Sequence, residues 1–282
     1  MKTILVPVDF SGYSNNALDF AYELAKKHGD ANIQILHIIE SMDTQSYNTM
    51  GIVSSNDQVD LFLNLMIKGV QKQMDVIVND PKYSEVEMIP HVHYGRPYES
   101  ISEAIAEHDA FVVVMGTLGS SGLDELFIGS NTEKVVRYAK CPVIAIPEGA
   151  KFHDIKNVVY ATNLTVEDND VVQRLKIGQE LFGAHLHILW VNTIHVLKTD
   201  EDMGAKLEKF AQSNGLSNYS VHVSKGIFAE AGILNYADEI NADMIAMTTG
   251  GRKGIAYLFS GSLAEDVVNH SCLPVWTYSI SK

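Results

Sequence analysis

Gly116-Thr-Leu-Gly119, followed after nine residues by Gly129-Ser130, is the most informative stretch of the chain. The apolar run 111–115 before it predicts a buried strand, and the residues after Ser130 have the spacing of a helix. Glycines ahead of a helix N-terminus let the backbone approach a phosphate, and the free N–H groups there favour an anion. The stretch therefore predicts an anion site between a strand and a helix.

An imperfect copy of this stretch lies in the second half of the chain. It reads Thr248-Thr-Gly-Gly251, then nine residues, then Gly261-Ser262. The offset of 132 residues between the two copies also relates Glu133 to Glu265. Matches that keep their order and spacing indicate a duplication.

The two copies differ in length. Near their starts the offset is 154, as between Asp9 and Asn163, so the first copy carries 22 additional residues. These fall between the second and third strands, where 41–82 includes a long amphipathic stretch. We expect two tandem domains, residues 1–149 and 150–282.

Apolar strands alternate with helical spacing in both copies, which predicts an α/β fold with five strands in each domain. Such strands form a parallel sheet with helices on both faces. We expect strands at 3–8, 33–39, 85–94, 110–115 and 142–147, and again at 157–162, 186–191, 219–224, 243–247 and 274–278. We expect helices at 15–27, 60–76, 97–107 and 132–139, and again at 166–182, near 207, at 230–240 and at 263–269.

The composition indicates a packed globular protein, with 46% hydrophobic and 20% charged residues. The formal charge of −14 argues against a nucleic-acid partner, because binding to phosphate backbones needs clustered cations. Two cysteines in 282 residues do not make a disulfide framework, and no apolar run is long enough to span a membrane. We expect a cytoplasmic protein.

Asp9 directly follows the first predicted strand, and Gly116 follows the fourth. Ligands of open parallel sheets bind beyond the carboxyl ends of strands, where the strand order reverses. If these two strands are neighbours, Asp9 accepts hydrogen bonds from a ribose or base while the glycine stretch holds phosphates. The alternative is that Asp9 and Ser11 only cap the next helix.

Ser130 also has a purely structural interpretation. Ser130-Asn-Thr-Glu133 and Ser262-Leu-Ala-Glu265 both fit the capping-box pattern. A capped helix N-terminus is still electropositive, so capping and anion binding are compatible.

Four segments resemble the universal stress protein family. They are Ile4-Leu-Val-Pro-Val-Asp-Phe-Ser11, Leu36-His-Ile38, Met115-Gly-Thr-Leu-Gly119 with Gly129-Ser130, and Cys141-Pro-Val143. The resemblance covers both copies, and the complete glycine pattern in the first copy is typical of the ATP-binding branch. It implies sheets of order 3-2-1-4-5. It also implies edge-to-edge pairing of the last strands, which two fused domains can make within one chain.

The resemblance implies ATP as the ligand, with ADP, AMP and Mg²⁺ left open. Asp9 is implied to contact ribose and base, and Ile38 to offer backbone atoms to adenine. The residues implied to line the nucleotide in domain 1 are Pro7, Asp9, Ile38, Met115, Gly116, Gly119, Gly129, Ser130 and Asn131.

Departures from the family pattern weaken this expectation in places. Ser120-Ser121 stands where family members often carry a basic residue. The absence of that cation lowers the expected affinity for a triphosphate. In the second copy Thr248 replaces the first glycine, and a β-branched residue cannot approach as closely. We expect nucleotide mainly in domain 1. In domain 2 we expect a weak or altered site, or none. Its candidate residues are Asn163, Gly251, Arg252, Gly261 and Ser262. Arg252-Lys253 is alternatively a pair of solvent-exposed side chains on a turn.

Other candidate chemistry is incomplete. His91 with His93 and His185 with His187 share strand faces, but neither pair has the three or four ligands that zinc needs, so we expect no metal site. Cys141 is expected to be a small buried hydrophobe.

We therefore expect a cytoplasmic ATP-binding regulatory protein of the stress response. No general base or lysine suited to phosphoryl transfer stands out, so at most slow ATP hydrolysis is expected. The alternative is an interaction module without nucleotide, whose glycines are turns and whose 22 additional residues form the partner surface. The protein partner and homodimerisation are left open.

Overall fold

The computed structural model describes residues 1–40, 56–118, 128–164, 169–193, 199–249 and 263–280, with backbone alone for 56–60, 62 and 169. In these residues ten strands form one sheet of order β3-β2-β1-β4-β5-β10-β9-β6-β7-β8. The strands are β1 (Lys2–Pro7), β2 (Ala31–Glu40), β3 (Met88–Gly95), β4 (Val112–Gly116), β5 (Val143–Ile146), β6 (Asn157–Ala161), β7 (His185–Thr193), β8 (Tyr219–Gly226), β9 (Met244–Thr249) and β10 (Val275–Ser279).

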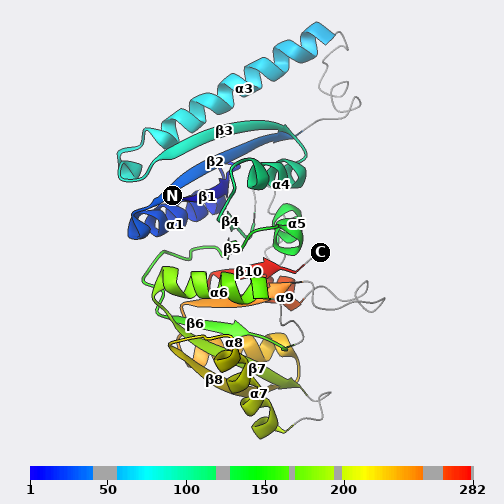
Figure 1. Cartoon of the computed structure of the whole chain (residues 1–282). Coiled ribbons are helices and arrows are strands. Elements are labelled where there is room, and N and C mark those ends of the chain that lie inside the picture. Colours follow the sequence, from blue (N-terminus) through cyan, green and yellow to red (C-terminus); the bar gives the residue numbers. More distant parts are fainter. Residues whose placement is uncertain (41–55, 119–127, 165–168, 194–198, 250–262, 281–282) are drawn as a thin grey trace.

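Each half of the sheet has the order 3-2-1-4-5, which confirms the expected fold of each domain. Neighbouring strands within a half run parallel, and β5 and β10 join the halves antiparallel, with Trp276 opposite Ile144. The expected pairing of the last strands within one chain is confirmed. Each strand covers an edge that would otherwise expose unpaired N–H and C=O groups, and Figure 1 shows the sheet running through both domains.

Helices cover both faces of the sheet. The helices are α1 (Gly12–His28), α3 (Asn56–Val78), α4 (Pro97–Glu107), α5 (Ser130–Tyr138), α6 (Asn169–Phe182), α7 (Asp200–Ser213), α8 (Ala229–Glu239) and α9 (Leu263–His270), with a 3₁₀ turn at Pro81–Tyr83. Residues of α1, α3, α6 and α7 share one core, and residues of α4, α5, α8 and α9 share the other. Strand side chains alternate between these cores: Ile4 and Val6 lie in the first and Leu5 in the second.

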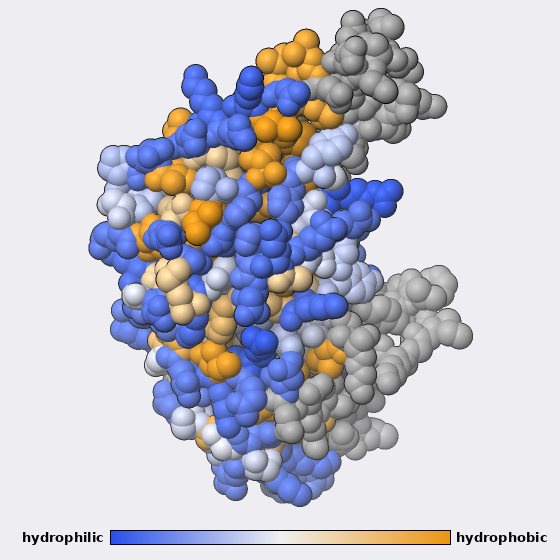
Figure 2. Space-filling view, turned by 45° about the horizontal axis from the view of Figure 1, so that its top comes forward, coloured by the Kyte–Doolittle hydropathy of each residue, from blue (hydrophilic) through white to orange (hydrophobic). Residues whose placement is uncertain are grey.

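The additional residues of domain 1 lie where the sequence places them. Between Glu40 and Met88 there are 47 residues, whereas 25 separate Thr193 from Tyr219, and the difference is the expected 22. The 23-residue helix α3 exceeds its 14-residue counterpart α7. Its Leu61, Leu65 and Val76 are at least 60% exposed, and Figure 2 shows hydrophobic surface at this end of the molecule.

Two boundaries differ from the expectation. Helix α1 begins at Gly12, three residues earlier than predicted, because Ser11 caps it. Strand β3 begins at Met88, since the 3₁₀ turn precedes it. Among the described helices, none combines the length and apolar character needed to cross a bilayer.

Candidate functional site

The ends of β1 and β4 lie side by side at the carboxyl edge of the first domain's sheet. Ile4 pairs with Val112 and Leu5 with Val113, in parallel register. Asp9 and Thr117, four residues further along each chain segment, therefore leave the sheet at the same edge. The strand order reverses between β1 and β4, which is where open α/β sheets bind ligands.

Asp9 lies in a tight turn between β1 and α1. Its Oδ1 atom accepts a hydrogen bond from the Ser11 N–H at 3.0 Å. Ser11 Oγ accepts from the Ser14 N–H at 3.2 Å, so Ser11 is the N-cap of α1. The capping interpretation therefore holds for Ser11, while Asp9 stabilises the turn and is itself half exposed at the sheet edge.

His37 on β2 braces this turn. Its Nδ1 atom lies 2.8 Å from the Val8 carbonyl oxygen, and its ring stacks on Phe10 with 4.5 Å between centroids. Phe10 has a φ of 63°, which a non-glycine residue adopts only where its surroundings hold it. Burial lowers the pKa of His37, so the ring is neutral and donates from Nδ1 to Val8. Ile38, the predicted adenine contact, is the next residue on the same strand and is half buried.

Gly116 ends β4 beneath the first turn of α1. A Cβ atom at this position would lie 3.0 Å from the Tyr13 carbonyl oxygen and 3.1 Å from the Tyr13 carbonyl carbon. Gly116 therefore lets the backbone of α1 cross closely over the strand. The glycine that the sequence assigns to a phosphate has a packing role as well, and its φ is not positive.

Helix α5 begins at the same sheet edge and is tied to β4 by two hydrogen bonds. The Gly129 N–H donates to the Thr117 carbonyl at 2.8 Å. The buried Thr132 hydroxyl donates to the Gly116 carbonyl at 3.0 Å. The N-terminus of α5 is thereby fixed next to the end of β4.

The capping box predicted at Ser130 is wrong. The N-cap is Gly129, no side chain caps the helix, and Ser130 is its exposed first residue. Helix α5 starts one residue earlier than a Ser130 cap requires, because the bond to Thr117 places Gly129 at the helix entrance. The first-turn N–H groups of an uncapped helix are electropositive, and those of Ser130 and Asn131 lie at this end of α5.

The second copy reproduces part of this arrangement. Asn163 is exposed after β6, and Leu164 has a φ of 55°, close to that of Phe10. Thr248 is half buried on β9, and Ala264 stands at the position of Thr132, so the hydroxyl bond to the strand end has no counterpart. Of the predicted site residues, Gly119, Gly251, Arg252, Gly261 and Ser262 lie outside the described residues.

Three histidines gather at the outer edge of domain 2. His185 Nε2, His187 Nδ1 and His222 Nε2 lie 3.0, 3.3 and 2.9 Å from the single Ser220 hydroxyl oxygen. Burial, with the neighbouring imidazoles, lowers the pKa of His187 to about 4. Within the described residues no group of three His, Cys, Asp or Glu side chains has an arrangement suited to a metal ion.

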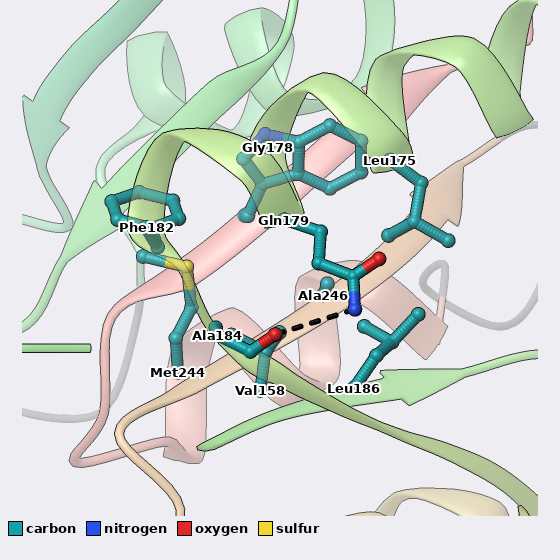
Figure 3. A pocket seen from close by; sticks show the side chains of 10 residues that line it. Val158, Leu175, Gly178, Gln179, Phe182, Ala184, Leu186, Met244 and Ala246 are labelled. Atoms are coloured by element: carbon teal, nitrogen blue, oxygen red, sulfur yellow. Dashed lines mark hydrogen bonds between the residues drawn. The ribbon is translucent and has the colours of Figure 1, made fainter. Parts of the chain in front are cut away.

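Two other features belong to the packed interior. Cys141 is buried as expected, and burial raises the pKa of its thiol to about 12. The apolar cavity beneath α6, shown in Figure 3, has a volume of about 20 Å³. That is room for one water molecule at most, so the cavity is a packing defect.

The sequence did not point to His37, to Thr132 or to Asn269 of α9, whose Oδ1 atom accepts a hydrogen bond from the Ile128 N–H. Thr132 lies inside the predicted capping box, and His37 lies inside the Leu36-His-Ile38 segment. Both residues are therefore in segments that the sequence singles out, but no role was predicted for either. Asn269 is recognisable only by its offset of 132 from Arg137. Its contact with domain 1 requires the tertiary structure.

A sequence model described as the Universal stress protein family matches residues 1–147 and 155–279. The chain belongs to the universal stress protein family. Over its full length this universal stress protein is similar to one from Synechocystis, with 24% identity covering 99% of this chain and all of the relative. One from Bacillus subtilis is 29% identical over 51% of this chain and 97% of its own.

The architecture of this universal stress protein is also similar to a solved one. The crystal structure of a universal stress protein from Archaeoglobus fulgidus has a TM-score of 0.77, with 22% identity over 99% of this chain and 98% of its own. This likeness shows that the tandem arrangement recurs in a second chain.

Proposed function

We propose that this chain is a cytoplasmic ATP-binding regulatory protein of the stress response, with the nucleotide held mainly in domain 1. The observation that carries the proposal is the uncapped N-terminus of α5, fixed by Gly129 and Thr132 at the sheet edge where Asp9 lies. Phosphates would meet the N–H groups of Ser130 and Asn131, while Asp9 accepts from ribose or base. ADP and AMP fit the same crevice, and Mg²⁺ would accompany the phosphates.

Binding without efficient turnover is the expected behaviour. Phosphoryl transfer needs cations on the transferred group and a residue that positions the nucleophile. Neither lysine nor arginine is among the crevice residues described above, and Ser120-Ser121 supplies no cation. We expect at most slow ATP hydrolysis.

Equilibrium titration of the nucleotide-free full chain with ATP tests the proposal. Asp9→Ala should weaken binding about tenfold, because a charged acceptor contributes roughly 1.5 kcal/mol. The duplicate supplies the matched control, since Asn163→Ala makes the corresponding change in domain 2 and should leave the affinity unchanged.

Two results contradict the proposal. One is the absence of binding at millimolar ATP to wild-type protein shown to be folded and nucleotide-free. The other is a loss of affinity in Asn163→Ala that equals the loss in Asp9→Ala, which would place the nucleotide elsewhere.

An interaction module without nucleotide is the second candidate. The exposed Leu61, Leu65 and Val76 of α3 favour it, because large apolar side chains grouped on one helix are typical of partner surfaces. This function accounts for the chain if ATP binds neither domain.

A further inference from the structure

Domain 2 contacts the end of the predicted phosphate segment of domain 1. The Oδ1 atom of Asn269, on α9, accepts a hydrogen bond from the backbone N–H of Ile128. Ile128 immediately precedes Gly129, the N-cap of α5, and packs against the core shared by α4, α5, α8 and α9. A domain 2 side chain therefore holds the backbone at the entrance of the helix that faces the nucleotide.

An ion pair between the partly buried Arg137 and the buried Glu265 holds α9 against α5. Arg137 donates from Nε to Glu265 Oε1 at 2.6 Å and from Nη2 to Glu265 Oε2 at 2.5 Å. The Glu265 side chain is 6% exposed, and Ser279 Oγ donates to the Arg137 carbonyl at 2.7 Å. Two parallel bonds fix the orientation of the partners as well as their distance. The position of Asn269 relative to Ile128 is thus defined by a rigid contact.

The duplication makes this contact directional. Arg137 and Asn269 are equivalent positions, 132 residues apart. Arginine carries five N–H donors and no acceptor, so Arg137 cannot receive a backbone N–H from domain 2 as Asn269 receives one from domain 1.

We propose that Asn269 is a positioning residue for the nucleotide site of domain 1, so that domain 2 completes this site. The inference rests on the proposed function, because it concerns where that nucleotide meets its phosphate contacts. Asn269 fixes Ile128, and Ile128 fixes the entrance of α5 and with it the direction of the N–H groups at Ser130 and Asn131. The affinity for phosphate-bearing ligands therefore depends on Asn269. The affinity for adenosine does not, because adenosine has no phosphate and would contact only Asp9 and Ile38.

The test compares full-length variants at position 269. Asn269→Leu has a similar size but no acceptor, whereas Asn269→Asp keeps an oxygen for the Ile128 N–H. Asn235→Leu makes the same exchange on the exposed side of α8 and is the control. For each protein, the affinities for ATP and for adenosine and the hydrogen-exchange rate of the Ile128 amide are measured.

We expect Asn269→Leu to weaken ATP binding about five- to tenfold, the loss typical of one hydrogen bond, with adenosine binding unchanged and faster exchange at Ile128. Asn269→Asp should keep the Ile128 amide protected and regain part of the ATP affinity, and Asn235→Leu should match wild type. Equal losses for ATP and adenosine in Asn269→Leu would reveal general destabilisation and overturn the inference. Unchanged ATP affinity in that variant would overturn it while leaving the proposed function intact.

Failure of the proposed function gives a different pattern. If wild type binds neither ligand, ATP binding by this chain is rejected, and the inferred role of Asn269 in it is rejected as well. The Ile128 exchange rate then reports whether the interdomain contact itself exists in solution.

Discussion

At the scale of single residues, Ser220 shows how hydrogen-bond chemistry determines a charge state. A hydroxyl donates one hydrogen bond and accepts two. His222 can donate from Nε2 to Ser220, and the Ser220 O–H can donate to His187 Nδ1, because His187 Nε2 faces the Asn157 amide oxygen, which accepts. A proton on His187 Nδ1 would point at this O–H, so the geometry favours the neutral ring, as burial does.

Acid should therefore destabilise domain 2 through His187. Its pKa is lowered from 6.5 to about 4 on folding, so its contribution is complete above the unfolded-state pKa and is lost as pH falls from 6.5 towards 4. The groups facing it are His185, His222, Tyr236 and Asn157, and Glu239 raises the pKa of His222 slightly against the effect of burial.

The measurement is urea unfolding of the wild type and His187→Gln between pH 7 and pH 5. Glutamine is chosen because Gln34 is the domain 1 residue equivalent to His187. Gln34 pairs with Leu5 of β1, and His187 pairs with Val159, the equivalent residue of β6. The variant should lose about 1 kcal/mol less than wild type over this interval, because solvent at the half-exposed ring reduces the effect. Identical pH slopes would show that His187 does not titrate as described.

Gly116 shows how much a single residue of the sequence can predict. A glycine here predicts that another group approaches the backbone closely, and such an approach is present. The sequence cannot say which backbone or ligand approaches, and the structure shows that Tyr13 of α1 is one such neighbour. Local patterns predict a close contact; the identity of the partner depends on elements distant in sequence.

At the scale of elements, two helical glycines that look alike in the sequence should respond oppositely to alanine. Gly178 is in the middle of α6, where an added Cβ meets nothing within 4 Å, and it lines the cavity of Figure 3. Gly232 is in α8, where an added Cβ would lie 2.4 Å from Val191 Cγ1. The gain in helix propensity is similar in both, so packing against the sheet decides the sign.

Thermal and urea unfolding measure both effects. Gly178→Ala should raise the free energy of unfolding by about 1 kcal/mol. Gly232→Ala should lower it by about 1–3 kcal/mol through overpacking. Adding Val191→Ala to Gly232→Ala removes the clashing methyl groups. The double variant should therefore be more stable than the sum of the two single losses in unfolding free energy predicts, and an additive loss would contradict overpacking as the cause.

The elements themselves were largely predictable, and their ends less so. Alternating apolar runs and helical spacing identified each described strand and helix, and Pro97–Glu107 was predicted to the residue. The start of α5 was missed because a tertiary bond to Thr117, rather than the Ser130 side chain, places its first turn. A sequence offers several candidate N-cap residues, and tertiary contacts decide which of them starts the helix.

At the scale of the whole molecule, the shared sheet and the Arg137–Glu265 ion pair are among the contacts that join the two domains. Thr277 at the β5–β10 junction is fully buried, and α5 packs against α9 beside it. The family resemblance implied this junction, whereas the Arg137–Glu265 pair was not predictable, because its two residues are 128 positions apart and belong to different domains. We therefore expect the domains to unfold together.

The two tryptophans allow this cooperativity to be measured, since Trp190 lies on β7 and Trp276 on β10 at the junction. Trp190→Phe and Trp276→Phe each leave one fluorescent reporter, and in each variant the fluorescence midpoint in urea should coincide with the midpoint from far-UV circular dichroism. Different midpoints for the two probes within one variant would show independent domains.

Arg137→Met should lower the free energy of unfolding at pH 7 by about 3 kcal/mol, because it removes the guanidinium from the buried Glu265 carboxylate. The deficit should shrink as the pH falls, since protonation of Glu265 removes its buried charge. Adding Glu265→Gln should restore much of the loss for the same reason. A deficit that is independent of pH, and that Glu265→Gln does not relieve, would mean that Arg137 acts through packing and that the charge pair does not hold the two domains together.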